Sequence, residues 1–175
     1  MSEPSLYVAD TNVRIDVSNG GVVTHFHTLL MSVCAPNVIV AEAKGGVGPV
    51  FLSHGMSEFE LSIDDMREAQ RLRRKRPKVS FNDMCAYVVA RNTRAVLLTG
   101  DKYLRTFAEE QRVKVHGVLW VLDEFVRLEL LAKIKAAKAL QSMLDQGSRL
   151  PQNQCEKRFL KWALKTIDGQ TSLKK

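Results

Sequence analysis

The sequence has few of the features that mark secreted, zinc-binding or membrane-spanning proteins. Its three cysteines, Cys34, Cys85 and Cys155, are odd in number and widely spaced, which predicts reduced thiols rather than a disulfide framework. No CxxC pair or Cys/His cluster indicates a zinc site. No apolar run reaches the roughly 18–20 residues that cross a bilayer, and the first residues lack a secretory signal pattern. These absences predict a cytoplasmic protein with no membrane association.

The composition predicts a compact domain with a basic surface. The chain has 175 residues, of which 45% are hydrophobic, enough to bury a core of ordinary size. Its net charge of +7 comes from 26 Lys and Arg residues against 19 Asp and Glu residues. This excess favours an anionic partner such as nucleic acid, although a basic protein without such a partner has the same composition.

Short apolar runs alternate with amphipathic segments, which predicts an α/β fold with a parallel sheet. Strands are expected at residues 6–9, 95–99 and 113–115, with a weaker candidate at 50–52 and a loop or irregular strand at 53–61. Helices are expected at residues 11–17, 38–44, 63–76, 81–92 and 102–111. From residue 121 the pattern is wholly helical. We therefore expect a domain at 1–120, a C-terminal helical extension of it at 121–167, and a polar tail at 168–175.

Two acidic residues follow predicted strands directly. Asp10 ends the run Leu6–Ala9, and Asp101 follows the run Ala95–Thr99 after one glycine. The carboxyl ends of strands in open α/β sheets form the crevice that carries the chemistry. If these two strands are neighbours, both carboxylates lie in one crevice.

Two further acids are candidates for the same crevice. Asp83 lies in the first turn of the helix that Ser80 opens, and Glu42 lies among apolar residues of the helix after Pro36. Several carboxylates in one crevice repel each other unless a cation neutralises them. Oxygen ligands select hard ions such as Mg²⁺ or Mn²⁺, which can activate water and stabilise charge on a phosphate.

Each acid also has a purely structural interpretation. Asp10 and Asp101 can cap the helices that follow them, Ser80 with Asp83 resembles a capping box, and Glu42 can be a solvated helix residue. Taken singly, the structural interpretation is favoured for Asp83 and Glu42. The joint pattern of Asp10 and Asp101 is what favours a metal site.

Several short motifs together resemble those of the PIN-domain nucleases. VADTN at residues 8–12 is similar to the opening motif of that family, and SFND at 80–83 resembles its Ser-x-x-Asp helix start. LTGDKYL at 98–104 resembles its late Thr-x-Asp element, and residues 36–42 match the place of its second acid. Glu58 and Glu60 compete with Glu42 for that second position. The likeness runs from about residue 6 to 120.

The resemblance implies a three-layer α/β/α sandwich with strand order 3-2-1-4-5 and a metal-dependent phosphodiesterase activity on RNA. Asp10, Glu42, Asp83 and Asp101 then correspond to catalytic, metal-binding acids for Mg²⁺ or Mn²⁺. Asn12, Ser80 and Thr99 would orient the ligands or the substrate. Many small bacterial relatives are VapC-like toxins that a cognate antitoxin inhibits, so a toxin role, an antitoxin partner and a homodimer are also expected.

A dense run of basic residues precedes the Asp83 helix. It places six cations in eight positions: Arg71, Arg73, Arg74, Lys75, Arg76 and Lys78. We interpret it as an edge that binds RNA phosphates, which would make affinity salt-dependent. The alternative is a solvated helix end that complements the helix dipole.

Other classes fit less well. A haloacid-dehalogenase-type phosphatase needs Asp-x-Asp after the first strand, but Asn12 stands at the second position. Gly45–Gly48 is not followed by Lys and Ser or Thr, so a P-loop is not indicated. The non-enzyme alternative is a catalytically inactive PIN-like module that binds RNA or a partner protein. Phe159 and Trp162 of the last helix are candidates for a dimer or antitoxin contact.

Overall fold

The computed structural model describes residues 6–29, 32–42 and 47–163. The predicted polar tail at 168–175 lies outside these residues. Within them the strands are Tyr7–Ala9 (β1), Val33–Pro36 (β2), Ser57–Phe59 (β3), Val96–Leu98 (β4) and Val115–His116 (β5). No helix in this part of the chain has the length and hydropathy that a membrane span requires.

The strands form one parallel sheet in the order β3-β2-β1-β4-β5, as the resemblance implies. β1 lies between β2 and β4, and its pairing with β4 places Ala9 opposite Leu98. The first and fourth strands are therefore neighbours, and the residues that follow them emerge at the same edge of the sheet.

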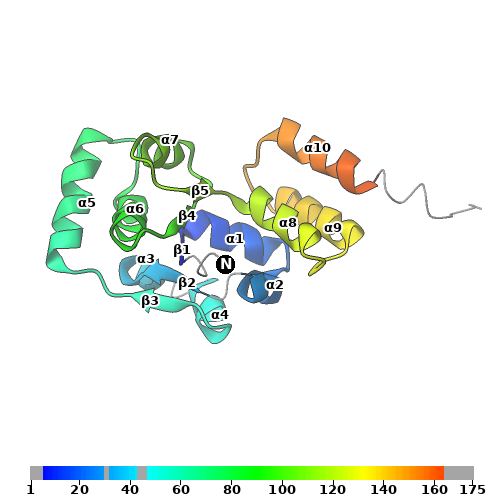
Figure 1. The fold of residues 1–175 in the computed structure, drawn as a ribbon, viewed down its shortest axis with the longest axis horizontal. Coiled ribbons are helices and arrows are strands. Elements are labelled where there is room, and N and C mark those ends of the chain that lie inside the picture. The colour runs from blue at the N-terminus through cyan, green and yellow to red at the C-terminus, as the bar shows by residue number, and fades with distance from the viewer. Residues whose placement is uncertain (1–5, 30–31, 43–46, 164–175) are drawn as a thin grey trace, which may run out of the picture.

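Helices account for most of the described residues. They are Thr11–Asn19 (α1), Val23–Leu29 (α2), Asn37–Glu42 (α3), Val47–Ser53 (α4), Ile63–Lys75 (α5), Phe81–Thr93 (α6), Lys102–Glu110 (α7), Val118–Arg127 (α8), Lys133–Asp145 (α9) and Gln152–Ala163 (α10). Figure 1 shows α5, α6 and α7 on one side of the strands and α1, α2, α8 and α9 on the other. The arrangement is the predicted α/β/α sandwich.

Alternate strand residues point into separate cores on the two faces of the sheet, as the pleat requires. Val8 and Leu97 belong to the core beneath α5, α6 and α7. Ala9 and Leu98 belong to the core shared with α1, α2, α8 and α9. Both faces are covered by helices, which explains why the inner strands β1, β2 and β4 are uniformly apolar rather than alternating.

Serine caps fix the start of two helices on the first face. The Ser62 hydroxyl accepts a hydrogen bond from the Asp65 amide, and the Asp65 carboxylate accepts one from the Ser62 amide, completing a capping box for α5. The Ser80 hydroxyl caps α6 in the same way through the Asp83 amide. Both caps follow from local sequence, and both helix starts are as predicted.

The weak strand expected at residues 50–52 is wrong. These residues lie in α4, and the strand that pairs with β2 is β3, inside the segment expected to be a loop or irregular strand. Phe51 is fully buried and packs edge-on against Phe26 of α2, with ring centroids 5.7 Å apart. Three apolar residues in a row do not distinguish a strand from a buried helix turn.

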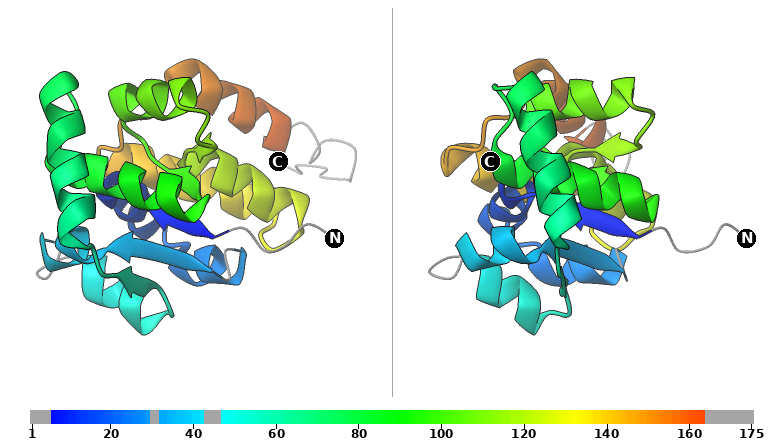
Figure 2. Two further views of the ribbon diagram at one scale, coloured as in Figure 1. Left: turned by 60° about the vertical axis from the view of Figure 1, so that its left-hand side comes forward. Right: turned by 90° about the vertical axis from the view of Figure 1, so that its left-hand side faces the viewer.

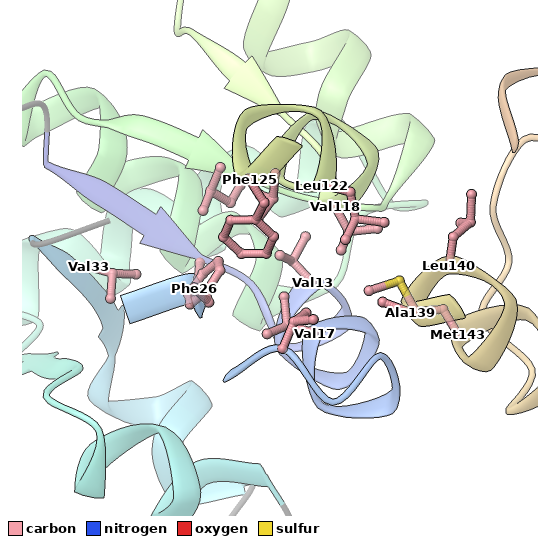
Figure 3. Packing of buried hydrophobic residues seen from close by; sticks show 14 of the residues in the cluster. Val13, Val17, Phe26, Val33, Val118, Leu122, Phe125, Ala139, Leu140 and Met143 are labelled. Carbon is pink, nitrogen blue, oxygen red and sulfur yellow. The ribbon is translucent and has the colours of Figure 1, made fainter. Parts of the chain in front are cut away.

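The C-terminal helices share the second core with the sheet. Figure 3 shows Phe125 of α8 in the same cluster as Val13, Val17 and Phe26. The expected boundary at residue 120 falls inside α8, and α10 packs on α9 at the outside of the molecule (Figure 2). The partner contact suggested for Trp162 is wrong, because its side chain is only 2% exposed within its own chain.

Candidate active site

Asp10 is the first residue after β1 and is completely buried. Its amide donates to the Leu98 carbonyl of β4 at 3.0 Å, which extends the β1–β4 ladder to the acid itself. Its Oδ1 accepts from the Val13 amide at 2.7 Å and so caps α1. Its Oδ2 is buried and has no hydrogen-bond partner among the described residues.

The surroundings of Asp10 favour its protonated form when no cation is present. The pKa of Asp10 is raised to about 7; burial is the largest cause, and the nearby Asp83 carboxylate contributes to the rise. The hydrogen bond from the Val13 amide, together with the nearby Thr99 side chain and Gly100 amide, which are not in hydrogen-bond geometry with Oδ2, offsets only part of that rise. A buried acid with an unsatisfied oxygen and a like charge beside it is the arrangement that a bound cation would relieve.

Asp101 lies at the same sheet edge, two residues beyond Thr99. Its Oδ1 accepts from the Leu104 amide at 2.7 Å and caps α7, while its own amide donates to the Thr99 hydroxyl at 3.0 Å. Because Ala9 and Leu98 are paired in register, Asp10 and Thr99 leave the sheet together. The structure thus places Asp10 and Asp101 at the same edge of the sheet, as the sequence argument requires.

Asp83 approaches from α6. The Ser80 hydroxyl donates to Asp83 Oδ2 at 2.7 Å, and the charge of Asp83 acts on Asp10. The three acids therefore lie at the N-terminal ends of α1, α6 and α7, where the positive ends of helix dipoles favour negative charge. For Asp10 and Asp101 the capping role and a ligand role are compatible, because a carboxylate has two oxygens and capping uses one.

Glu42 is the last described residue of α3, and its side chain lies outside the described residues. α3 follows β2 without a gap, so it begins at the same edge of the sheet as α1 and α7. The competing acid Glu58 lies on the exposed edge strand β3, and Glu60 follows it on the surface. Which acid takes the second position stays a prediction.

The polar residues expected to orient this site lie around it. Thr99 is fully buried, and its hydroxyl holds the Asp101 amide. Asn12 lies beside Gly100, where an added Cβ would be in ordinary van der Waals contact with the Asn12 Cβ at 3.7 Å. Ser80 is bound to Asp83, as described above. Thr99 and Ser80 are therefore hydrogen-bonded to an acidic residue, and Asn12 lies beside the glycine that precedes Asp101.

Arg14 is a residue of this region that the sequence pattern did not single out. It is completely buried one helical turn after Asp10, and its Nε donates to the Asp10 carbonyl at 3.3 Å. Its Nη2 donates to the Thr11 hydroxyl, also at 3.3 Å, while its Nη1 is buried without a partner among the described residues. The spacing i, i+4 from Asp10 was the available signal, but it does not distinguish a buried arginine from a solvated one.

The donor set suits a hard divalent ion, although the described part of the chain holds no complete metal site. Asp10, Asp83 and Asp101 offer only oxygen, which is the chemistry that Mg²⁺ and Mn²⁺ prefer. Among the described residues, no three His, Cys, Asp or Glu side chains are grouped closely enough to hold an ion. The unpartnered Asp10 Oδ2 is the atom that fits a cation best.

The basic run divides into paired and unpaired cations. Arg71 makes a bidentate pair with Glu68 at 2.7 and 2.8 Å. Arg76 binds Glu110 at 2.8 Å, and Lys78 Nζ lies 4.8 Å from the centroid of the Tyr103 ring. The cations of the run with neither an ion pair nor a ring contact in the described residues are Arg73, Arg74 and Lys75.

A cleft connects this basic run to the α7 end that carries Asp101. It has a volume of about 430 Å³ and lies between the end of α5 and α7, with Lys75, Lys78, Lys102 and Tyr103 in its lining. Lys102 follows Asp101 directly. The basic run is thus adjacent to the acidic crevice, although half of its cations are engaged with their own chain.

The fold and these acids define an α/β protein with an acidic site at the carboxyl edge of a parallel sheet. A family model described as a PIN domain matches residues 6–163, and the chain belongs to the PIN-domain family. A search of curated proteins finds no match. PIN domains are typically nucleases that use divalent metals, so membership indicates a nuclease-type function. The match also includes the helices after residue 120.

Proposed function

We propose that this protein is an endoribonuclease that hydrolyses RNA phosphodiester bonds with Mg²⁺ or Mn²⁺. The observation that carries the proposal is the buried Asp10 carboxylate, which has an unpartnered Oδ2, a pKa raised to about 7 and Asp83 beside it. Such a group is costly to bury, and perturbed acids in a crevice are typical of functional sites. Family membership supports the same activity.

In this proposal Asp10, Asp83, Asp101 and Glu42 hold the ion. When bound, the ion would supply an activated water and neutralise charge on the scissile phosphate. The Thr99 hydroxyl accepts a hydrogen bond from the Asp101 amide and so fixes the turn that places Asp101. Asn12 orients the substrate, and Ser80 holds the Asp83 carboxylate in place. The N-terminal ends of α1 and α7 add favourable electrostatics for an anion.

The first test is cleavage of labelled single-stranded and structured RNA by the purified chain. We expect cleavage with Mg²⁺ or Mn²⁺, no cleavage with EDTA, and recovery when metal is added back. Asp101→Asn serves as the control for a contaminating nuclease, because asparagine keeps the α7 cap. If the variant cleaves as fast as the wild type, the activity does not come from this site. If the wild type binds RNA without cleaving it, the protein is the inactive PIN-like binding module.

The basic run is expected to contribute RNA affinity through its unpaired cations. Replacing Arg73, Arg74 and Lys75 with alanine should lower the slope of log affinity against log salt by about 0.7 for each phosphate that is no longer neutralised. The matched control replaces Lys133, Lys135 and Lys138 of α9, which removes the same charge on the opposite face of the sheet. Fluorescence-anisotropy titrations at several salt concentrations measure the slope. If the slope falls equally in the two triple variants, only the net charge of the protein matters for RNA affinity.

We further propose that the protein is a cytoplasmic toxin of a toxin–antitoxin pair and that it forms a homodimer. The three cysteines are free and buried, which suits a reducing compartment. The toxin role predicts that induced expression arrests growth and that Asp10→Asn removes the arrest. Normal growth on expression would reject the toxin role.

The homodimer predicts a mass of about twice 19.7 kDa in light scattering. A monomer mass would reject the homodimer.

A further inference from the structure

A second pocket lies beside Asp101 and shares Lys102 with the cleft at the basic run. It has a volume of about 370 Å³, within the range of small-ligand sites. One wall comes from the site itself, with Asn12, Gly100 and Asp101. The opposite wall comes from the turn between α9 and α10, residues 146–150. The C-terminal helices therefore build half of a pocket whose other half is the candidate active site.

The turn is held in place by several hydrogen bonds to α1. The Ser148 hydroxyl donates to the buried Asp16 carboxylate. The Gln146 side-chain amide donates to the Asn19 carbonyl at 2.8 Å, and the Ser142 hydroxyl donates to the same carbonyl at 2.7 Å. α1 begins at Asp10, so these bonds fix the turn to the helix that carries the central acid.

The pocket combines cations and an apolar surface. Arg149 and Lys102 line it, are exposed, and have no ion-pair partner among the described residues. The pocket also has two acidic residues. Asp101 is proposed to bind the ion, and the Asp16 carboxylate accepts a hydrogen bond from the Ser148 hydroxyl. Ile15, which is 40% exposed, and Leu150 offer an apolar surface. An anion with an attached flat or apolar group fits this lining.

We propose that this pocket binds one nucleotide of single-stranded RNA next to the scissile phosphate. Arg149 and Lys102 contact its phosphate, and its base lies against Ile15 and Leu150. The inference rests on the proposed ribonuclease function and assigns the C-terminal helices a role in substrate binding. Lys102 also lines the cleft beside the basic run, so the RNA would pass Asp101 with protein on both sides.

Arg149 is the residue that tests the proposal. In EDTA, Arg149→Ala should weaken binding of a short labelled single-stranded RNA by about fivefold. It should also lower the salt slope by about 0.7, the value for one phosphate contact on a single strand. Arg149→Lys should keep the slope, because it retains the charge. Lys135→Ala is the matched control because it removes the same charge away from the pocket. Lys135 lies on α9, roughly 15 Å along the helix from the C-terminal end that leads into the turn.

The outcomes separate this inference from the proposed function. If wild type binds and cleaves RNA but Arg149→Ala binds as Lys135→Ala does, the pocket is not a substrate site and the ribonuclease proposal stands. If wild type neither binds nor cleaves RNA, both proposals fail together. If Arg149→Ala melts at a lower temperature than the wild type, its weaker binding could come from lost stability, and Arg149→Lys is then the test. A salt slope for Arg149→Lys as low as that of Arg149→Ala would overturn the phosphate contact. With Mg²⁺, a raised KM at unchanged kcat is expected for Arg149→Ala.

Discussion

Replacing Asp10 with asparagine should reduce metal-dependent RNA cleavage by about a thousandfold or more and, at the same time, stabilise the metal-free protein. The loss of activity follows because asparagine cannot supply the negative charge that a divalent ion needs. Asparagine is nevertheless a good helix cap, so the bond from the Val13 amide and the start of α1 should be kept. The substitution therefore separates the ligand role of Asp10 from its capping role.

The stability gain has a defined dependence on pH. The pKa of Asp10 is about 7 in the folded chain against 3.8 for an ordinary aspartate, so folding favours the protonated form. Below pH 4 Asp10 is protonated in both the folded and the unfolded state, so its ionisation does not change the free energy of unfolding. Between pH 4 and 7 the unfolded state ionises first, and the wild type loses up to about 4 kcal/mol of stability. Above pH 7 the loss is complete.

Urea denaturation of wild type and Asp10→Asn from pH 4 to 8, in EDTA, measures this effect. The free energies of unfolding should be similar at pH 4 and diverge in favour of the variant as the pH rises. Added Mg²⁺ or Mn²⁺ should stabilise the wild type at pH 8 and leave the variant nearly unchanged. A variant that is less stable than the wild type at pH 8 without metal would show that the Asp10 carboxylate is satisfied by the protein alone.

Replacing Phe125 with alanine should destabilise the protein by about 3–5 kcal/mol. Phe125 is fully buried and lies in the core that contains Val13 and Val17 of α1 (Figure 3). Its removal leaves a cavity between the C-terminal helices and the helix that carries Asp10. For a chain of this size the melting temperature should fall by roughly 10 °C.

Ile134→Ala is the matched control for Phe125→Ala. Ile134 lies on α9 and is 59% exposed, so its truncation should change the free energy of unfolding by less than about 0.5 kcal/mol. Thermal denaturation of both variants in EDTA makes the comparison. Similar melting temperatures for the two would mean that α8 is an accessory element rather than part of the domain core.

Local sequence was sufficient to place most helices and three of the candidate acids. Ser62 and Ser80 fix the starts of α5 and α6 through bonds to residues three positions later. Asp10 and Asp101 follow strands that are recognisable as short apolar runs. Where only three apolar residues stood together, as at 50–52, the local pattern was ambiguous and the prediction of a strand was wrong.

The basic run shows the limit of reading charge from sequence. Six cations predicted a phosphate-binding edge, but Arg71, Arg76 and Lys78 contact Glu68, Glu110 and Tyr103, respectively. Glu110 and Tyr103 lie far along the chain from their partners, so only the tertiary fold, which brings the segment after α5 next to α7, forms these pairs. The sequence shows how many charged residues the run contains, whereas the fold determines which of them remain available to a ligand.

The sequence by itself determined which residue types end the strands and begin the helices, because those preferences act within a few positions of the chain. Tertiary structure alone decided that β1 and β4 are neighbours, that Asp10 Oδ2 is buried with no partner among the described residues, and that residues 146–150 face Asp101. Each of these depends on contacts between segments far apart in sequence. Burial and strand order follow from how the helices cover both faces of the sheet, which no local preference specifies.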